Sequence, residues 1–305
     1  MKSRMKLSLA MTCLITAGFT AHLYADNDTF GTQISAQVTA NYADTRDSCG
    51  SYAQPAFACS GVIIRSTRYS DAYRSWEPSA KHKSAGAVSF SYLRADSKFN
   101  EMAGVGRNGF IRYPDDQMPA GMNGTQVICA FPIDGGSDER QVLGCDDSNL
   151  TPEFESSCQQ QSITTAEQWY AFYVKNNKSH HRQCAFDVLT GPTGPAAKEF
   201  IENLRAMQYI QDESFGSLGK SNNELRIATW ADGLGKAFPV MSFFYIEGGL
   251  EAAQKDQKAF HADTGRFVPI LNVTLPRSPS EDATFTYLPS DQLALNDRSG
   301  QSNHR

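Results

Sequence analysis

The stretch Gly86-Ala87-Val88-Ser89-Phe90-Ser91-Tyr92-Leu93-Arg94-Ala95-Asp96-Ser97-Lys98-Phe99 sets the expected fold of the first half of the chain. Apolar residues alternate with serines in its first part, and this period of two predicts a strand with one packed face. The strand is expected to end at Arg94, and the next three residues are typical of a turn. A guanidinium at a strand end can bind a phosphate or a carboxylate of a ligand through its fork of N–H donors. The simpler alternative is that Arg94 pairs with the nearby Asp96.

Short apolar patterns of the same kind predict that the first half of the chain is mostly β-structure. Strands are expected at 34–42, 60–66, 108–113 and 125–131. The proline in Trp76-Glu77-Pro78-Ser79 interrupts any helix, so residues 69–85 are expected to form a long loop. Its aromatic residues either line a pocket for a flat ring or fix the loop to the domain.

Helical spacing marks the second half of the chain. Capping patterns and apolar residues at helical intervals predict helices at 165–175, 195–207, 222–237 and 250–263. Ser221 and Glu224 form the capping box of the third helix, although residues 225–230 also fit a strand. Strands are expected at 184–189, 240–246, 267–275 and 284–288. The predicted fold class is therefore α+β, with a mixed or antiparallel sheet and helices mainly in the C-terminal half.

The N-terminus has the layout of a secretory signal peptide. Three basic residues precede an apolar run over 7–19, and small and polar residues follow through Ala25. We expect a signal peptide at 1–25, a single domain at 26–290 and a disordered tail at 291–305. The domain has a β-rich part at 34–150 and an α/β part at 160–290. The sequence has no later run of about 18 apolar residues, so no membrane span is expected. With its signal peptide, the protein is expected to be secreted.

Charge and cysteine content narrow the class of protein further. With 28 basic and 33 acidic residues, the chain lacks the excess of Lys and Arg that a nucleic-acid-binding protein uses. One of the 7 cysteines lies in the leader. The even number that remains predicts disulfides in an exported chain, and we favour pairing of sequence neighbours: 49–59, 129–145 and 158–184. Metal ligation by His180, His181 and Cys184 is the alternative; no Cys-x-x-Cys pair completes a zinc site, and we expect no metal.

Two resemblances bear on function. Tyr92-Leu93-Arg94-Ala95-Asp96-Ser97 is similar to the Tyr-Arg-Ala-Asp-Ser opening of cholera-type enterotoxin A chains, in which the arginine holds NAD. A broader set of motifs over roughly 35–290 resembles the halovibrin family of secreted, toxin-like ADP-ribosyltransferases or NAD glycohydrolases. These motifs include Cys59-Ser60-Gly61-Val62-Ile63-Ile64-Arg65, Trp76-Glu77-Pro78-Ser79, Asp212-Glu213-Ser214-Phe215, Asn223-Glu224-Leu225-Arg226-Ile227-Ala228-Thr229-Trp230, Phe243-Phe244-Tyr245 and Gln254-Lys255-Asp256-Gln257.

The halovibrin resemblance implies that the single domain is catalytic and that NAD is its substrate. Breaking the nicotinamide–ribose bond passes through an oxocarbenium-like transition state, which a neighbouring carboxylate stabilises. An arginine is needed for the pyrophosphate, and hydroxyl or aromatic groups are needed for the nicotinamide. The sequence contains no Gly-x-Gly-x-x-Gly and no Walker loop, which disfavours a Rossmann fold and hydride transfer. Water and a protein are both open as acceptors of ADP-ribose.

Arg94 is the first candidate for holding the phosphates, with Arg65 as its rival or companion. Ser89 and Ser91 are candidate positioning hydroxyls, similar to the Ser-Thr-Ser strand of arginine-type ADP-ribosyltransferases. In that family the serine strand follows the arginine strand, an order that Arg65 satisfies and Arg94 does not. Trp76 is the candidate ring for stacking on the nicotinamide.

Glu213 is the first candidate for the catalytic carboxylate and Glu224 the second, because Glu224 also has the capping role. Glu153-Phe154-Glu155, and Asp256 between Gln254 and Gln257 on a helix expected to be exposed, are weaker candidates. The alternative function is a non-catalytic secreted binding or adhesion module. A secreted hydrolase or nuclease is less favoured, because no metal cluster or nucleophile triad can be assembled from the sequence.

Overall fold

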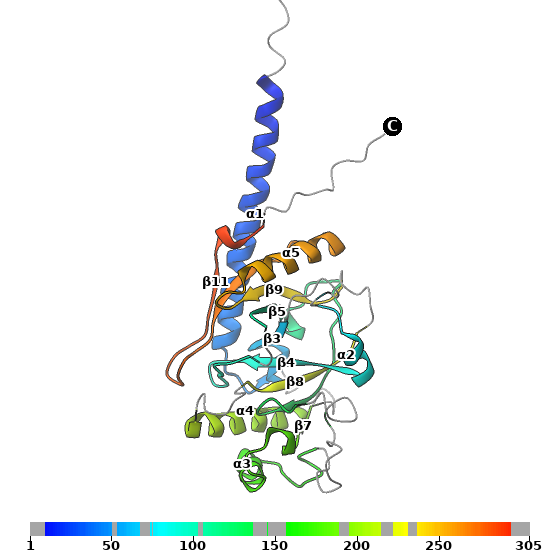
Figure 1. Cartoon of the computed structure of the whole chain (residues 1–305), viewed down its shortest axis with the longest axis vertical. Helices are drawn as coiled ribbons and strands as arrows, with labels where there is room; N and C mark the ends of the chain where they lie inside the picture. The colour runs from blue at the N-terminus through cyan, green and yellow to red at the C-terminus, as the bar shows by residue number, and fades with distance from the viewer. Residues whose placement is uncertain are drawn as a thin grey trace, which may run out of the picture.

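A computed structural model describes the chain over residues 10–50, 54–67, 74, 76–102, 106–136, 145, 157–188, 195–214, 222–230 and 237–293. In two of its helices, side chains are described only over 27–43 and 197–212. The described residues form a large mixed sheet with helices on both of its faces (Figure 1). The α+β class predicted from the sequence is confirmed.

The sheet has nine strands in the order β11-β10-β9-β5-β3-β4-β8-β6-β7. Among them, β9 and β10 pair parallel and the other neighbours pair antiparallel. The strands are β3 Val62–Thr67, β4 Ala87–Leu93, β5 Asn108–Arg112, β6 Val127–Phe131, β7 Phe186–Asp187, β8 Glu224–Ala228, β9 Val240–Tyr245, β10 Ile270–Thr274 and β11 Thr284–Tyr287. Two short strands, β1 Ser48–Cys49 and β2 Gln54–Pro55, form a separate antiparallel pair.

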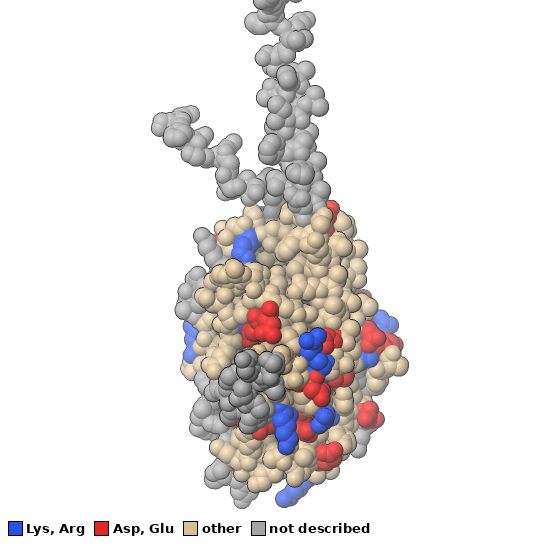
Figure 2. Space-filling model, turned by 180° about the vertical axis from the view of Figure 1, so that it is seen from behind, with Lys and Arg blue, Asp and Glu red and all other residues tan. Residues whose placement is uncertain are grey.

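The helices lie mostly in the C-terminal half, as predicted. The α-helices are α1 Ala10–Ala43, α2 Ala80–Ala85, α3 Ala166–Lys175, α4 Pro195–Ser214 and α5 Leu250–Thr264. Short 3-10 turns are η1 Ala56–Ala58, η2 Asp115–Gln117, η5 His180–Arg182 and η7 Pro289–Asp291. None of the helices that the structure describes combines the length and the apolar composition needed to cross a membrane. On the face that Figure 2 shows, the described basic side chains lie among acidic ones.

Helix α1 replaces the strand that was predicted at 34–42. Ile34, Val38 and Tyr42 are buried at intervals of four residues, which is the spacing of one helix face. The helix packs against β11: the Ser35 hydroxyl donates to the Phe285 carbonyl at 2.6 Å, across 250 residues of chain. Its N-terminal half extends beyond the sheet (Figure 1).

Strand β8, over 224–228, replaces the first part of the helix predicted at 222–237, and the alternative of a strand at 225–230 is the one that the structure supports. Residues 231–236 of that helix lie outside the described residues. Leu225 and Ile227 are buried in the core that α5 covers, while Glu224 and Arg226 point to the opposite face. The strand pairs with β4 on one side and with β6 on the other. Because these two ladders satisfy the backbone of β8, local helix propensity does not prevail.

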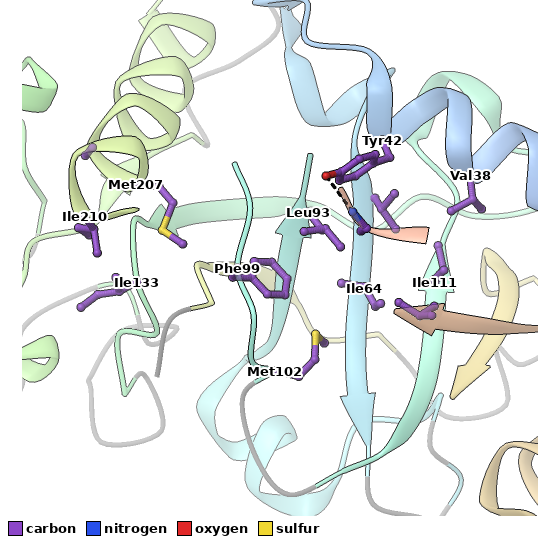
Figure 3. Close-up of a cluster of buried hydrophobic side chains, with 14 of the residues drawn as sticks. Val38, Tyr42, Ile64, Leu93, Phe99, Met102, Ile111, Ile133, Met207 and Ile210 are labelled. Carbon is purple, nitrogen blue, oxygen red and sulfur yellow. Dashed lines mark hydrogen bonds between the residues drawn. The ribbon is translucent and has the colours of Figure 1, made fainter. Parts of the chain in front are cut away.

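The sheet separates two hydrophobic cores. On the side we call the α1 face, Val62, Ile64, Leu93 and Ile111 pack with α1 and with part of α4 (Figure 3). The other side, the α5 face, carries a core of aromatic residues from the central strands together with residues of α5. Alternation along each strand therefore assigns every central residue to one face or the other.

Two further features of the chain follow from the contacts. The disulfides Cys49–Cys59, Cys129–Cys145 and Cys158–Cys184 are the three pairs predicted from sequence neighbours. Residues 291–293, which the prediction assigned to the tail, are described and pack on the domain: the Leu293 N–H donates to the Gln257 side chain at 3.0 Å. Asp291 is buried and its carboxylate accepts a hydrogen bond from the Tyr245 hydroxyl at 2.6 Å.

Candidate functional site

Ser89, Ser91 and Glu224, which the sequence marks as candidates, lie on the same face of the sheet. Strand β4 pairs antiparallel with β8, and Ser89 stands opposite Arg226 in the register. Since side chains alternate along a strand, both serines share the α1 face with Glu224 and Arg226. These four residues lie 130 or more positions apart across the two strands, so only the strand pairing joins them.

Glu224 is the centre of this group and is 3% exposed. Its Oε1 accepts a hydrogen bond from the Ser89 hydroxyl at 2.6 Å, and its Oε2 accepts one from the backbone N–H of Gly135 at 2.7 Å. The nearest guanidinium nitrogen of Arg226 lies 3.7 Å from Oε1. The carboxylate is thus held by a hydroxyl, an amide and a cation, each bearing on it from a different part of the chain.

Arg226 is fully buried and acts on Glu224 partly through Ser89. Its Nη1 donates to the Ser89 oxygen at 2.6 Å, and its Nη2 donates to the Ala87 carbonyl at 3.2 Å. The Ser89 hydroxyl, which is partly exposed, therefore accepts from the guanidinium and donates to the carboxylate. This order polarises the hydroxyl and strengthens its bond to the carboxylate.

Asn222 and Ser91 extend the polar group along the strands. The Asn222 amide nitrogen donates to the Ser91 oxygen at 3.4 Å, and both side chains are buried. The Asn222 Oδ1 is buried without a hydrogen-bond partner within the part of the chain that the structure describes. Burying an acceptor without a hydrogen bond costs free energy of folding. The Asn222 Oδ1 is thus an acceptor beside Ser91 that a ligand could use.

The segment after β6 brings Gly135 to Glu224. A Cβ on Gly135 would lie 3.0 Å from the ring of Phe131, so the glycine backbone rests directly on that ring. Phe131 is opposite Glu224 in the register of β6 and β8, and Cys129 is opposite Arg226. The Phe131 ring therefore supports the Gly135 backbone in the position from which its N–H donates to the Glu224 carboxylate.

Such a group has a clear chemical capacity. An ionised carboxylate next to a buried guanidinium is stable only because each is paired, and the pairing fixes its orientation before any ligand arrives. A carboxylate held in this way stabilises positive charge that develops nearby and accepts hydrogen bonds from sugar hydroxyls. The arrangement supports chemistry at a cationic or hydroxyl-rich centre.

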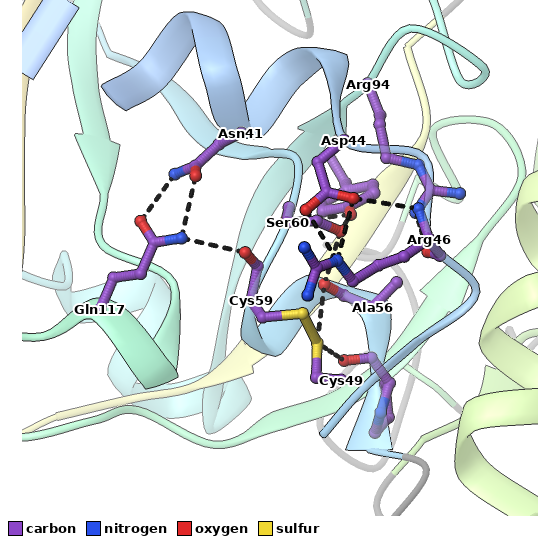
Figure 4. Close-up of polar contacts among 11 residues, drawn as sticks. Asn41, Asp44, Arg46, Cys49, Ala56, Cys59, Ser60, Arg94 and Gln117 are labelled. Atoms are coloured by element: carbon purple, nitrogen blue, oxygen red, sulfur yellow. Dashed lines mark hydrogen bonds and ion pairs between the residues drawn. A yellow bond between two sulfur atoms is a disulfide. The ribbon is translucent and has the colours of Figure 1, made fainter. Parts of the chain in front are cut away.

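Arg94 lies outside this group and has other partners (Figure 4). It is 1% exposed; its Nε and Nη2 donate to the two carboxylate oxygens of Asp96 at 2.5 and 2.7 Å. Its Nη1 donates to the Arg46 carbonyl at 2.7 Å. The pairing with Asp96, offered as the simpler alternative, is the one observed. Holding phosphates with Arg94 would require these bonds to open.

Arg65 and Trp76 lie on the α5 face, so the sheet separates them from the two serines. Arg65 is buried with its guanidinium 5.9 Å from the centre of the Phe90 ring. Trp76 is 1% exposed and meets the rings of Phe243 and Phe260 edge to face. Arg65 and the two serines do follow the expected order of an arginine strand and then a serine strand. Their side chains nevertheless lie on opposite faces of the sheet, because side chains alternate between the faces along each strand.

The other candidate acids have different surroundings. The side chain of Glu213, and the whole of 153–155, lie outside the described residues. Asp256 is buried rather than exposed, and its carboxylate accepts from the Asn108 amide at 2.6 Å on the α5 face. The Glu224 side chain caps no helix, because this residue begins a strand.

Sequence reasoning missed Arg226, Gly135 and Asn222. The alternation in Glu224-Leu225-Arg226-Ile227 was a usable signal, because a strand there places the acid and the arginine on one face. Gly135 had no local signal. The metal alternative loses a ligand, because Cys184 is bonded to Cys158. A described cluster of Cys49, Cys59 and Asp116 also depends on two disulfide-bonded sulfurs.

A scan of known protein families found no model that matches the chain, and a search of curated proteins found no similar sequence. The resemblance to the halovibrin family and to enterotoxin A chains therefore depends on the motifs quoted above.

Proposed function

We propose that the protein is a secreted enzyme that cleaves NAD between nicotinamide and ribose, with Glu224 as its catalytic carboxylate. The observation that carries this proposal is the position of Glu224, buried and fixed between Ser89, Gly135 and the guanidinium of Arg226. Three disulfides fit an exported chain. The motifs that resemble the halovibrin family supply the choice of NAD as substrate.

In the proposed reaction the cationic nicotinamide leaves with the bonding electron pair and the ribose becomes oxocarbenium-like. Glu224 stabilises the positive charge that develops on the sugar. Arg226 and Ser89 are positioning residues, because their hydrogen bonds hold the carboxylate in one orientation. Ser91 and Asn222 supply further polar groups for the substrate. The ribose is then captured by water or by a nucleophile on a protein acceptor.

We assign to Glu224 the role for which Glu213 was the first candidate, because Glu224 shares a face of the sheet with Ser89 and Ser91. Neither Arg94 nor Arg65 is assigned to the pyrophosphate in this proposal. Arg94 already uses its donors on Asp96 and on the Arg46 carbonyl, and Arg65 is buried on the opposite face of the sheet.

The experiment measures nicotinamide release from NAD by the purified, oxidised protein lacking residues 1–25. Glu224→Gln is expected to lower kcat about 100- to 1000-fold, as for removal of a group that stabilises transition-state charge. The matched control is Glu202→Gln, since Glu202 is also buried and is held by the Ala166 N–H and by Arg205. Rates are compared per folded molecule.

Two outcomes would overturn the proposal. Absence of NAD cleavage by the correctly disulfide-bonded protein would favour a binding or adhesion module. Cleavage that survives Glu224→Gln and fails in Glu213→Gln would move the carboxylate to α4.

A further inference from the structure

The peptide unit between Asp134 and Gly135 is held at both of its ends. Its N–H, on Gly135, donates to Glu224 Oε2 at 2.7 Å. Its carbonyl, on Asp134, accepts a hydrogen bond from the Gln183 side chain, whose Nε2 lies 3.3 Å from the oxygen. A peptide unit is planar, and its C=O and N–H point in opposite directions. The bond from Gln183 therefore fixes the direction in which the Gly135 N–H points.

The preceding peptide unit is held in the same way. The Ile133 carbonyl accepts from the same Nε2 of Gln183 at 3.3 Å, and the Asp134 N–H donates to the Asn222 carbonyl at 2.7 Å. Gln183 also donates to the His180 carbonyl at 2.9 Å. One side-chain amide thus holds two successive carbonyls, while the N–H groups of both peptide units meet the chain that leads into β8 and carries the candidate site.

The residues that follow Asp134 have no side chains that could fix this peptide by packing. The Phe131 ring supports the backbone of Gly135 from one side, but contact with the face of a ring does not prevent a peptide unit from rotating. Gly136 has a φ of +58°, which glycine adopts without strain. Rotation of the peptide unit would turn the Asp134 carbonyl toward the Glu224 carboxylate and break the hydrogen bond. The bonds at the two ends of the peptide unit oppose this rotation.

The backbone on which Gln183 stands is itself firmly held. Gln183 is 3% exposed and directly follows η5. The next residue, Cys184, forms a disulfide with Cys158, and its carbonyl accepts from Trp169 Nε1 at 3.3 Å. The side-chain amide is therefore in place before any ligand arrives, as a group that orients a catalytic residue must be.

We propose that Gln183 is a positioning residue of the candidate site, and that its side-chain amide keeps the Gly135 N–H directed at Glu224. This inference rests on the proposed cleavage of NAD and adds a residue to that reaction. Donation to the Asp134 carbonyl also polarises the peptide unit and makes its N–H a stronger donor. Gln183 acts on the ribose only through Glu224, so it should affect kcat and leave KM near the wild-type value.

The experiment replaces the amide by a side chain of similar size that donates no hydrogen bond, in Gln183→Met. Nicotinamide release is measured per folded molecule, and the Gly135 amide is followed by NMR through its proton shift and its hydrogen exchange. We expect kcat to fall about 10- to 100-fold, as for loss of a group that orients a catalytic residue. The Gly135 amide proton should move upfield and exchange faster, because its bond to Glu224 weakens.

Gln257→Met is the matched control. Gln257 is 1% exposed on the α5 face, and its Nε2 donates to the Val268 carbonyl at 2.9 Å and to Gln292 Oε1 at 3.1 Å. The same atoms are removed from an equally buried site that has no contact with the segment around Gly135. This variant should lose stability but keep the wild-type kcat and the wild-type Gly135 amide signal.

Gln183→Glu is the second variant, in case Gln183→Met does not fold. At about pH 8 it places a carboxylate against the carbonyls in place of a donor, so its kcat should fall further. Wild-type kcat in either folded Gln183 variant, or an equal loss in Gln257→Met, would overturn the inference. Failure of both Gln183 variants to fold while Gln257→Met folds would also overturn it, because Gln183 would then be needed for the fold itself. If the wild-type protein cleaves no NAD, the proposed function fails; an unchanged Gly135 amide in Gln183→Met would separately refute the positioning role.

Discussion

The buried pair of Glu224 and Arg226 gives the sharpest test of how the site is built. The perturbation is a double-mutant cycle of Glu224→Gln, Arg226→Met and both together. Each single change leaves one buried charge without its counterion, because the two side chains are 3% and 0% exposed. The double variant removes both charges and keeps much of the volume.

The expected magnitude follows from the geometry. At 3.7 Å and an effective dielectric constant of about 20, the attraction between the two charges is about 4.5 kcal/mol. Breaking a buried pair on one side costs about 3–5 kcal/mol in free energy of unfolding. We expect each single variant to lose that amount. The double variant should lose about as much as either single variant, rather than the sum of about 8 kcal/mol, because no unpaired charge remains.

The assay is equilibrium unfolding in urea without reductant, so that all three disulfides stay intact and ion pairs are not screened by the denaturant. The control is Glu251→Gln, which removes an exposed i, i+4 pair with Lys255. That change should leave the free energy of unfolding nearly unchanged, because water screens an exposed ion pair.

Additive losses in the double variant would show that the two charges do not interact in the folded protein. Losses below about 1 kcal/mol in both single variants would show that water reaches the pair, contrary to its burial. Either result would remove the basis for a preorganised carboxylate at this position.

Three further outcomes are expected. Arg94→Lys should lower the free energy of unfolding by about 1.5–3 kcal/mol in thermal or urea unfolding and leave turnover per folded molecule unchanged, because the lost bonds are structural. Gly109→Ala should yield little soluble protein while Gly124→Ala folds, because a Cβ on Gly109 would lie 1.9 Å from a backbone carbonyl of β3. Burial raises the pKa values of Tyr42 and Tyr173 to about 12, above an unfolded value of about 10. Their contribution to stability is therefore complete below pH ~10 and is lost between pH ~10 and ~12. If Tyr42→Phe or Tyr173→Phe removes absorbance at 295 nm that appears near pH 10 instead of near pH 12, this expectation is wrong.

Local patterns predicted β4 well and α1 badly, and the difference has a physical cause. In β4 the alternating residues are large, so the period of two reports real burial. Around Ile34, Val38 and Tyr42 the alternation is completed by alanines at 36 and 40, and these are exposed in the helix. Alanine fits both periods, so the large residues alone carried the signal, and they recur every four positions.

The candidate site was accessible to sequence reasoning only in part. Ser89, Ser91 and Glu224 were singled out one by one, but their meeting depends on the register between β4 and β8. That register joins positions 137 residues apart, and no local pattern encodes it. The same nonlocal geometry separates Arg65 from the serines, because the side of a strand on which a residue lies is decided by its pairing.

The contact of α1 with β11 has a consequence for the order of events during synthesis. Tyr287 donates to the Asp28 carboxylate at 2.8 Å across 259 residues, so the beginning of the domain is bonded to the last strand that the structure describes. A chain closed in this way stays incomplete until translation is almost finished.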